Sequence, residues 1–486
     1  MKGRVEALDA FRGLAILGMA WSGMLPDTLP AWMYHAQLPP PKHVFDPTIY
    51  GLTWVDLVFP FFLFSLGAAI PLALTSRLEK GESPLRIVLG LFARGLLLAG
   101  FAIFGEHLRS GEWSNPQDAS AWLAGLVGFV LLVLMFLRWP ARVPKNVARI
   151  VSAGAWLMAG VLIAWHMYPD GKRGFENSRN DIILMVLANV AVSGGVIWLL
   201  ARCRPLLRLA LMVVVAVIFL SANTPGSLAK LVWDYTPLQH VAFLGWAQSR
   251  FFPIFYHFEY HKYLLIVLPG TFCGDLLLKR RTLIVEQACE GAKTGRSIAV
   301  GLALISLAFP VIACFGLFSH EVIATSIVLI FCSAILLFLT SRLPMPQREL
   351  LMGLGRWGVA LLVIGLLAEP LGGGIRKDSP TLSYFLVTAG LAFLLVLGFI
   401  CLLENLNLDR PAKFLTMTGA NPILGYLVIT NLVMGLAGLS GWSDRIAATQ
   451  LINYPWGIAF VDGGFRTVLV AVVTSAFTKY RLFLRT

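Results

Sequence analysis

Long apolar stretches alternate with short polar segments along the whole chain. A transmembrane helix needs about 20 mainly apolar residues, with a range of roughly 17–25, and fourteen stretches meet this requirement. The pattern therefore predicts an all-α fold, a polytopic transmembrane helix bundle of about 14 spans that forms a single domain over residues 1–486. The predicted spans are 9–25, 54–75, 87–106, 119–138, 150–168, 181–201, 207–222, 262–279, 297–317, 321–341, 351–370, 382–403, 416–437 and 463–480.

The basic residues between these spans predict an orientation. If the N-terminus is inside, the cytoplasmic segments hold 25 Lys and Arg and the outer loops hold 11. Cytoplasmic loops of membrane proteins accumulate Lys and Arg, so we expect both termini in the cytoplasm. Two long loops, 26–53 and 223–261, then lie outside, and all eight histidines fall at or near the outer face.

Composition agrees with a membrane protein and argues against other classes. The 486 residues are 57% hydrophobic and 13% charged, whereas soluble domains carry about 25% charged residues. The net charge of +13 could suggest a nucleic-acid partner, but the sequence shows no zinc-finger spacing and no basic run interleaved with aromatics. The six cysteines show no CxxC spacing, so neither a metal site nor a disulfide framework is expected. We therefore expect the chain to contact membrane lipid and not to bind nucleic acid.

The loop 26–53 brings histidine close to a carboxylate. His35 and His43 flank a run of three prolines that stiffens the loop, and Asp56 lies just inside the outer end of the next span. Pro60 follows one turn later, where it can kink the helix and leave a carbonyl without its partner. A stiff loop that carries histidine above a buried carboxylate fits an acid/base site. The spacing alone does not choose between the two histidines.

Other polar groups on the predicted outer side could bind a substrate. The loop 223–261 is rich in Trp, Phe and Tyr, which form interfacial belts but also stack on sugar rings. An Asn-Pro pair within a span leaves backbone groups unsatisfied and so faces protein or water. The candidate substrate-binding residues outside the first loop are Asp234, His240, His257, His261, Lys377, Asp378, Tyr384 and Asn421.

The first span contains an acid and a base. Asp9 and Arg12 lie three residues apart, so they share one face of the helix and can neutralise each other. Charged groups inside spans are costly and are either paired or functional. Both interpretations, a structural ion pair and a functional role, stay open at this point.

Several sequence blocks resemble one known family. They are "ALDAFRGLAILGM", "YHAQ", "GLTWVDLVFPFFLFSLGAAIPL", "KYLLIVLPGTFCGDLL", "GGGIRKDSPTLSYFLVTAG" and "TGANPILGYLVI". In these blocks, scattered from residue 7 to about 430, the chain is similar to the heparan-α-glucosaminide N-acetyltransferase family and its bacterial homologues of the DUF5009 type. The D-x-F-R-G and D-L-V-F-P-F-F blocks are the most specific part.

The resemblance implies a transmembrane acyltransferase in a bacterial cytoplasmic membrane. Such an enzyme takes acetyl from cytosolic acetyl-CoA and delivers it to the amino group of a sugar on the outer, periplasmic face. Acetyl-CoA is the co-substrate, the acceptor is an amino sugar or another saccharide, and no metal is implied. The family core has about ten spans, so two extra hairpins are expected, near 119–168 and 297–341.

The resemblance also suggests roles for individual residues. The family's key histidine stands in an H-A dipeptide before the G-L-T-x-x-D-L-V-F-P block, and His35 matches it, so His35 is the expected catalytic histidine. About a dozen extra residues, 37–50, bring His43 closer to that block and make it the alternative. Asp56 would orient the histidine or bind the ammonium of the acceptor. Ser22, which stands where related enzymes carry asparagine, or Asn421 would hydrogen-bond the developing oxyanion. The candidate cofactor-binding residues are Asp9, Arg12, Lys279, Arg280 and Arg281; positive-inside bias is the competing explanation for the last three.

A second class of function fits the same features. A transporter or flippase for a saccharide or a lipid-linked sugar would have similar aromatic and histidine-rich outer loops, but it would not consume acetyl-CoA. A non-catalytic scaffold fits poorly with so many polar groups inside spans. The acceptor, N- versus O-acetylation, direct transfer versus an acyl-histidine, and the oligomeric state, a homo-oligomer included, stay open.

Overall fold

The computed structural model of the chain is built from α-helices that form two compact units. The structure describes residues 5–235, 258–286, 296–345, 347–447, 449 and 454–484. The first unit comprises Met1–Ile87, Gly194–Leu220 and Tyr263–Gly419, and the second comprises Val88–Ser193, Ser221–Lys262 and Ala420–Thr486. Two long helices, α3 (Pro84–His107) and α6 (Ile182–Ala201), have residues in both units.

The first unit contains most of the long helices. Its elements are α1 (Glu6–Ser22), the 3-10 turn η1 (Ala31–Met33), α2 (Trp54–Glu79), α7 (Pro205–Ser221), α11 (Leu264–Glu286), α12 (Arg296–Phe318), α13 (Val322–Ser341), α14 (Gln347–Leu367), the 3-10 turn η4 (Glu369–Gly372), α15 (Leu382–Ile400), the π-helical turn η5 (Cys401–Asn405) and α16 (Lys413–Gly419).

Helix α15 forms the centre of the first unit. Every residue of α15 after Leu382 is buried, and the helix packs against α1, α2, α11, α12 and α14. Its sequence has no charged residue and no polar face. A helix that is apolar all round is buried on all sides, and α15 satisfies this rule by packing among other helices.

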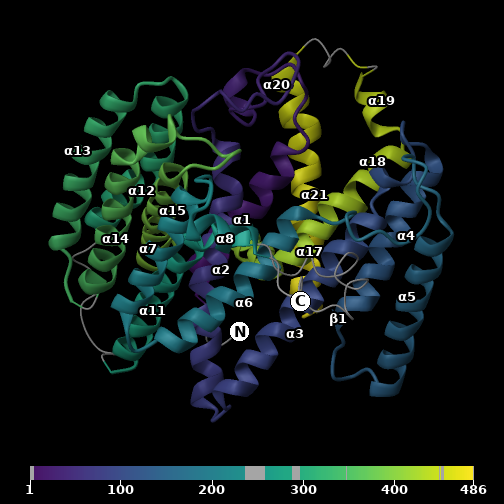
Figure 1. Ribbon diagram of the computed structural model, residues 1–486, viewed down its shortest axis with the longest axis horizontal. Helices are drawn as coiled ribbons and strands as arrows, with labels where there is room; N and C mark the ends of the chain where they lie inside the picture. The colour runs from purple at the N-terminus through teal and green to yellow at the C-terminus, as the bar shows by residue number, and fades with distance from the viewer. Residues whose placement is uncertain are drawn as a thin grey trace. The chain divides into compact units, whose positions relative to one another are not determined.

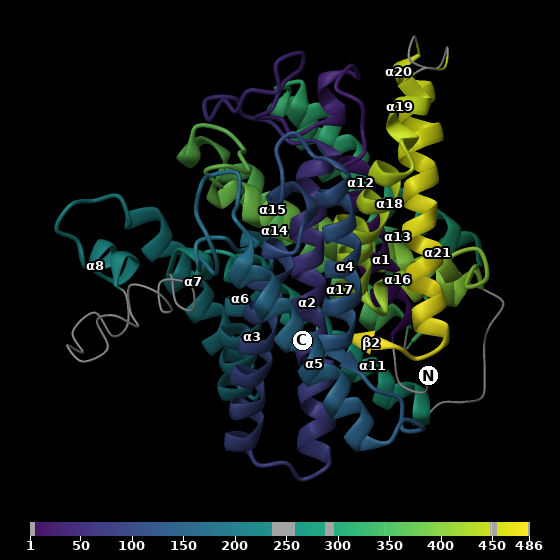
Figure 2. The ribbon, with the colours of Figure 1, turned by 90° about the vertical axis from the view of Figure 1, so that its right-hand side faces the viewer.

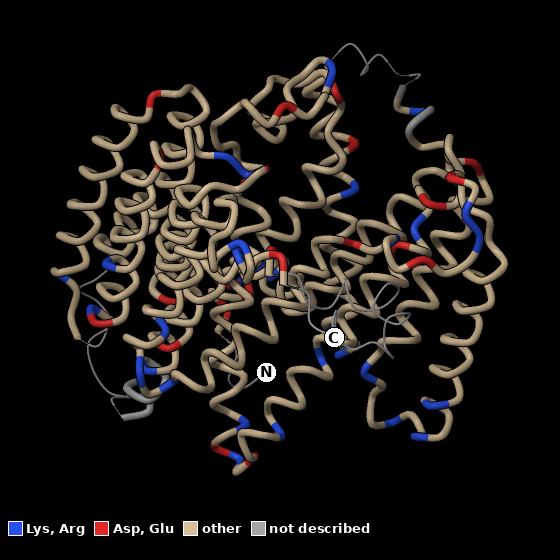
Figure 3. The backbone as a smooth tube through the Cα atoms, in the orientation of Figure 1, with Lys and Arg blue, Asp and Glu red and all other residues tan. Residues whose placement is uncertain are grey.

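Helices α12 and α13 form a hairpin over the region 297–341; that it is additional to the core of the family stays a prediction. They pack against each other, and α13 also packs against α14, as Figure 1 shows. After Arg296, neither α12 nor α13 contains Lys, Arg, Asp or Glu, so the charged residues lie at the helix ends (Figure 3). Large apolar side chains such as Phe315 and Ile323 point outward and are exposed. This arrangement is typical of helices that face lipid.

The second unit combines the other predicted hairpin with the C-terminal helices. Helices α4 and α5 pack against each other, and α18 packs on α4. The C-terminal helix α21 continues from α20 and η8 and is followed by a short strand, β2 (Figure 2). Strand β2 pairs antiparallel with β1, with Leu137 opposite Leu484 and Arg138 opposite Phe483. The elements are η2 (Ser110–Glu112), α4 (Ala119–Phe136), β1 (Leu137–Arg138), α5 (Lys145–Trp165), α8 (Leu228–Asp234), α10 (Phe258–His261), α17 (Pro422–Leu427), η6 (Val428–Val433), α18 (Met434–Leu439), α19 (Trp442–Ala447), α20 (Pro455–Ile458), η8 (Ala459–Gly463), α21 (Gly464–Lys479) and β2 (Phe483–Leu484).

The helices agree with the predicted spans in position but not in every detail. Each of the fourteen predicted segments overlaps a helix, and among the described residues 11 helices are long and apolar enough to cross a membrane. Of the other three, α1 and α7 have 17 residues each, and α11 carries charged residues toward its C-terminal end. The predicted span 416–437 is wrong as one helix, because α16 ends at Gly419 and α17 begins at Pro422. Asn421 has a non-helical φ of −135° and Pro422 starts a new helix, as proline at the first helical position often does.

Loops predicted to share one side of the membrane meet in the first unit. The amide of Gly51 donates to the carbonyl of Ile375 at 2.8 Å, and the rings of Tyr50 and His320 lie 4.3 Å apart. These contacts join three loops that the sequence assigns to the outer side. At the other helix ends, Lys279 forms an ion pair with Glu349, and both residues belong to segments assigned to the cytoplasm.

Candidate active site

The start of α2 fixes one carboxylate firmly. Thr53 caps the helix and Asp56 stands three residues later, forming a capping box in which each side chain satisfies a backbone amide of the other. The Oδ2 atom of Asp56 accepts hydrogen bonds from Thr53 N at 3.1 Å, Thr53 Oγ1 at 2.9 Å and Ala36 N at 3.3 Å. Asp56 is 2% exposed, so these donors replace the water that a buried carboxylate would otherwise need.

His35 lies directly against this carboxylate. Its Nδ1 atom is 2.7 Å from Asp56 Oδ1, and its side chain is 31% exposed. Because an ionised carboxylate only accepts hydrogen bonds, the short contact assigns the proton to Nδ1 in the neutral ring and leaves the lone pair on Nε2. A histidine held in one tautomer by a buried carboxylate, and partly open to solvent, is suited to accept a proton from a bound molecule.

A lysine from a distant part of the chain completes the cluster. Lys377 Nζ lies 3.4 Å from His35 Nδ1 and 3.5 Å from Nε2, and 3.4 Å from Asp378 Oδ2. Lys377 belongs to the loop between η4 and α15, and 342 positions separate it from His35. The cluster therefore brings together an imidazole, a buried carboxylate and a cation, groups that are chemically able to transfer a proton and to stabilise negative charge.

Gln37 holds the lysine loop in place. The amide of Asp378 donates to Gln37 Oε1 at 2.8 Å, and Gln37 Nε2 donates to the carbonyl of Asp378. Gln37 is only 3% exposed, and its own carbonyl accepts from Asp46 N at 3.0 Å. This two-point contact binds the His35 loop to the Lys377 loop. Asp46 in turn bonds Thr48, and the Thr48 hydroxyl and amide lower the pKa of Asp46.

The expected effect of Pro60 on α2 explains the position of Tyr384. Proline has no amide hydrogen, so the carbonyl of the residue four positions earlier, Asp56, loses its helical partner. The hydroxyl of Tyr384 donates to that carbonyl at 2.9 Å. Tyr384 is buried. This hydrogen bond gives Tyr384 a structural contact with the start of α2, and its role in binding a substrate stays a prediction.

His43 has other neighbours. Its Nε2 donates to the carbonyl of Asp27 at 3.1 Å, and its ring lies edge-on to Tyr34, with 4.5 Å between the ring centroids. Burial raises the pKa of the Tyr34 hydroxyl, which accepts a hydrogen bond from Leu29 N. These contacts shape the outer loop. The geometry thus favours His35 over His43 as the partner of Asp56.

Arg12 links three helices of the first unit. Its guanidinium donates to Ser65 Oγ and to the carbonyls of Ser65 and Gly419, each at 3.2 Å, and pairs with Asp9 at 3.3 Å. These contacts favour the structural interpretation of the Asp9 and Arg12 pair, and their binding of a cofactor stays a prediction. Ser22 donates from its hydroxyl to the carbonyl of Met19 at 3.0 Å.

The other predicted residues are distributed over both units. Lys279 is exposed and paired with Glu349. The side chains of Arg280 and Arg281, and both His240 and His257, lie outside the described residues. In the second unit Asp234 pairs with Lys230 at 2.9 Å. There the ring of the buried His261 stacks near Phe258, and Asn421 Nδ2 donates to the carbonyl of Leu482 at 2.8 Å. The substrate roles of these residues stay predictions.

Two residues near His35 and Asp56, and one cluster in the second unit, are not identified from the sequence. Thr53 could have been found, because a Thr three positions before an acidic residue at a helix start is the pattern of a capping box. Gln37 lies beside the H-A dipeptide but has no local signal, because its partner is far away in sequence. A buried cluster in the second unit was also missed: Arg109 contacts Asp181 at 3.0 Å and Tyr426 at 3.3 Å. Within the described part of the chain, no group of three or more His, Cys, Asp or Glu could hold a metal ion.

The helices and the site define a class of protein, a multi-pass membrane protein with a histidine, carboxylate and lysine cluster where its loops meet. Comparison with known families identifies the family of the chain. The family model described as "Domain of unknown function (DUF5009)" matches residues 4–277, more than half of the chain, and the chain belongs to this family.

Two curated proteins are similar to part of the chain. Heparan-alpha-glucosaminide N-acetyltransferase of Mus musculus is 31% identical over 141 residues, which is 28% of this chain and 20% of the mouse protein. The Homo sapiens protein of the same name is 34% identical over 150 residues, which is 30% of this chain and 21% of the human protein. The similarity thus spans about a fifth of each relative's length.

Proposed function

We propose that the chain is a membrane acetyltransferase that moves an acetyl group from acetyl-CoA to an amino sugar or another saccharide. The observation that carries the proposal is the contact of 2.7 Å between His35 Nδ1 and the buried Asp56, with Lys377 beside the ring. The similarity to two N-acetyltransferases supports the reaction type. Acid/base catalysis by a positioned histidine is a common means of acyl transfer.

The mechanism follows from the roles of the three side chains. His35 Nε2 takes a proton from the acceptor's amine or hydroxyl as that group attacks the thioester carbonyl. Lys377 Nζ stabilises the negative charge that develops on the carbonyl oxygen. The carbon–sulfur bond then breaks, and the imidazolium returns its proton to the leaving thiolate. Asp56 holds Nδ1–H and balances the imidazolium charge. Attack by Nε2 itself, through an acyl-histidine, is the alternative route.

We place the acceptor on the side opposite the acetyl-CoA supply. The excess of Lys and Arg in one set of loops supports cytoplasmic termini, with the loop 26–53 on the outer face of a bacterial cytoplasmic membrane. The basic end of α11, with Lys279, Arg280 and Arg281, is the candidate region for the CoA phosphates. Binding of acetyl-CoA should then weaken as salt rises, because exposed charges are screened over about 8 Å at physiological ionic strength.

One experiment tests the reaction and the histidine together. The purified chain in detergent is incubated with labelled acetyl-CoA and a panel of amino sugars, and labelled product is measured. We expect His35→Ala to lower transfer by about 10²–10⁴, the range for loss of a general base, while binding of acetyl-CoA persists. The transfer rate of Asp56→Asn should lie between those of wild type and His35→Ala, or equal that of His35→Ala. His43→Ala serves as the matched control and should cost much less.

The outcomes separate the competing explanations. A dead His43→Ala with a near-normal His35→Ala would show that the wrong histidine has been chosen. If both variants stay active, the acid/base role belongs to another residue. If the folded protein moves saccharide across a vesicle membrane but neither binds nor consumes acetyl-CoA, it is a transporter or flippase and not an acetyltransferase.

A further inference from the structure

A groove opens on the first unit where α13 begins and α14 ends. It has a volume of about 640 Å³, which is within the range of small-molecule sites, roughly 300–1,000 Å³. One wall is the face of α13 that carries Ile323, Ile327 and Ile330, three side chains between 52% and 79% exposed. Leu366 and Leu367 of α14 form the other wall. The groove therefore has long apolar sides formed by two helices that are apolar enough to span a membrane.

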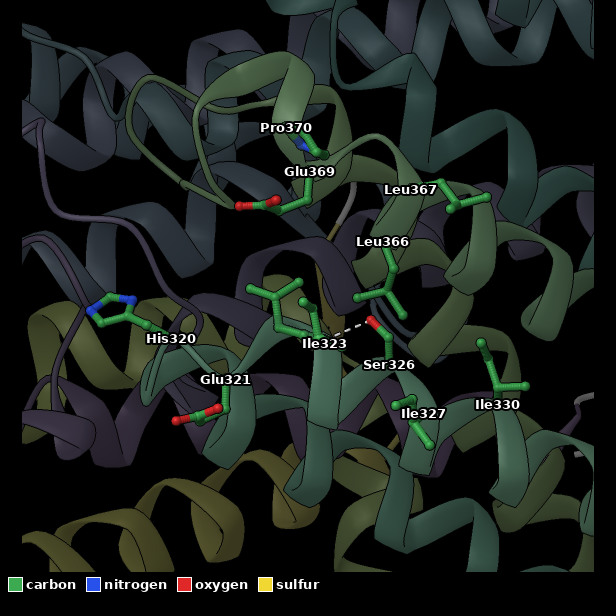
Figure 4. A pocket seen from close by; sticks show the side chains of 11 residues that line it. His320, Glu321, Ile323, Ser326, Ile327, Ile330, Leu366, Leu367, Glu369 and Pro370 are labelled. Carbon is green, nitrogen blue, oxygen red and sulfur yellow. Dashed lines mark hydrogen bonds between the residues drawn. The ribbon is translucent and has the colours of Figure 1, made fainter.

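The two ends of the groove differ in polarity. His320, Glu321 and Glu369 gather at one end, and Ile327, Ile330 and Leu367 lie toward the other (Figure 4). Within the groove, the Ser326 hydroxyl donates to the carbonyl of Val322 at 2.7 Å. The polar end coincides with the helix ends, where a membrane-spanning segment passes into the headgroup region. A change from polar to apolar along one groove matches the shape of an amphiphile.

The polar end of the groove carries two acidic side chains, Glu321 and Glu369. In the part of the chain that the structure describes, neither the Glu321 nor the Glu369 carboxylate has a hydrogen bond or an ion pair from another side chain. The neighbouring His320 stacks near Tyr50, 4.3 Å away, and Lys377 of the same loop pairs with Asp378. Both carboxylates lie at helix ends, at the level of lipid headgroups, where a cationic headgroup can pair with them, so the groove is complementary to a positive group.

We propose that this groove binds a membrane lipid whose headgroup carries a primary ammonium, such as an ethanolamine phospholipid. The acyl chain lies along Ile323, Ile327 and Ile330, and the ammonium contacts the carboxylates of Glu321 and Glu369. The lipid supplies the cation that the described residues do not. This binding does not depend on acetyl transfer, so it stands or fails separately from the proposed function.

Photo-crosslinking of a defined lipid tests the proposal. The full chain is placed in nanodiscs that contain phosphatidylethanolamine with a photoreactive acyl chain, and crosslinked peptides are mapped by mass spectrometry. We expect crosslinks on Ile323–Ile330 that unlabelled phosphatidylethanolamine displaces and phosphatidylglycerol with the same acyl chains does not. The double variant Glu321→Gln and Glu369→Gln should lower this crosslinking about tenfold, the factor that two lost charge contacts produce.

A matched control guards against general effects. Glu79→Gln removes an exposed carboxylate at the end of α2 and should leave crosslinking unchanged. The double variant is checked for folding by its thermal unfolding and its elution profile. Equal displacement by both lipids, equal crosslinking in the folded double variant, or crosslinks spread evenly over the exposed faces of α12 and α13 would each overturn the proposal.

Discussion

At the scale of single residues, the site depends on how Asp56 is held. Three hydrogen bonds from Thr53 and Ala36 fix one carboxylate oxygen, and His35 contacts the other. These donors hold the carboxylate in one orientation, and its second oxygen positions the imidazole ring through Nδ1. Contacts between distant parts of the sequence position Lys377 and Gln37 instead. The two predictions at this scale concern these two residues.

Lys377→Gln should lower acetyl transfer by about 10²–10³, the usual cost of losing one group that stabilises an oxyanion. The glutamine keeps most of the length of the side chain but loses its charge. Transfer is measured with saturating acetyl-CoA, so that a change in binding does not mimic a change in the chemical step. Lys42→Gln, an exposed lysine in the outer loop, is the control and should behave as wild type. A normal rate for Lys377→Gln would remove the lysine from the mechanism.

Gln37→Met should weaken the site by releasing the Lys377 loop. The methionine has a similar size but leaves the amide and carbonyl of Asp378 without their side-chain partner, which costs about 1–3 kcal/mol when such groups are buried. We expect kcat to fall while the KM for acetyl-CoA changes little, because the substitution displaces Lys377 but does not alter the binding of acetyl-CoA. Thr48→Ala, which alters the same loop at an exposed position, should leave kcat intact. An equal loss in both variants would point to general damage to the loop.

At the scale of elements, close contact between α2 and α11 supports the scaffold of the site. Gly270 and Gly274 of α11 are four residues apart, and a side chain on either would overlap the α2 backbone or Pro71. Small residues at this spacing let membrane helices approach closely. Since α2 carries Asp56 at its start, the packing of α11 helps to fix the carboxylate end of the site.

Gly270→Ala should destabilise the protein by about 1–3 kcal/mol, the usual cost of overpacking. The added methyl group would overlap the carbonyl oxygen of Phe64 and lie 3.0 Å from Ala68 N, so the two helices must separate. Thermal unfolding in detergent measures the change. Gly160→Ala on α5 is the control, because an added Cβ there meets nothing within 4 Å, and removing a helix glycine should be neutral or stabilising by up to about 1 kcal/mol. A Gly270→Ala protein as stable as wild type would contradict the close packing.

At the scale of the whole molecule, the chain forms two compact units, and whether they act as the single domain expected from the sequence stays a prediction. Elements from distant parts of the sequence build each unit. The loop of His35 and the loop of Lys377 meet in the first unit, on the same predicted side of the membrane. The orientation of the chain then decides on which side of the membrane the reaction takes place.

Cysteine accessibility in intact cells tests that orientation. Val44, in the outer loop, is 64% exposed, and Lys80, between α2 and α3, is exposed on the predicted cytoplasmic side. In a cysteine-free background, Val44→Cys should react with an impermeant thiol reagent in intact cells and Lys80→Cys only after lysis. The reverse pattern would place the site on the cytoplasmic face and remove the need for transfer across the membrane.

The sequence by itself determined the helices, because the length of an apolar run and the cost of burying unpaired backbone in lipid are local properties. It also contains a local signal for the break before α17, because Asn421 and Pro422 disfavour a continuous helix. The predicted span 416–437 did not take that signal into account. His35 and Asp56 could be proposed together because they are close in sequence and their family block is specific. The family resemblance already favours His35, and the tertiary structure shows that His35, not His43, contacts Asp56. Only the tertiary structure brings Lys377, 342 positions away in sequence, next to His35. Contacts between distant segments depend on how whole helices pack, and no pattern within one loop encodes that packing.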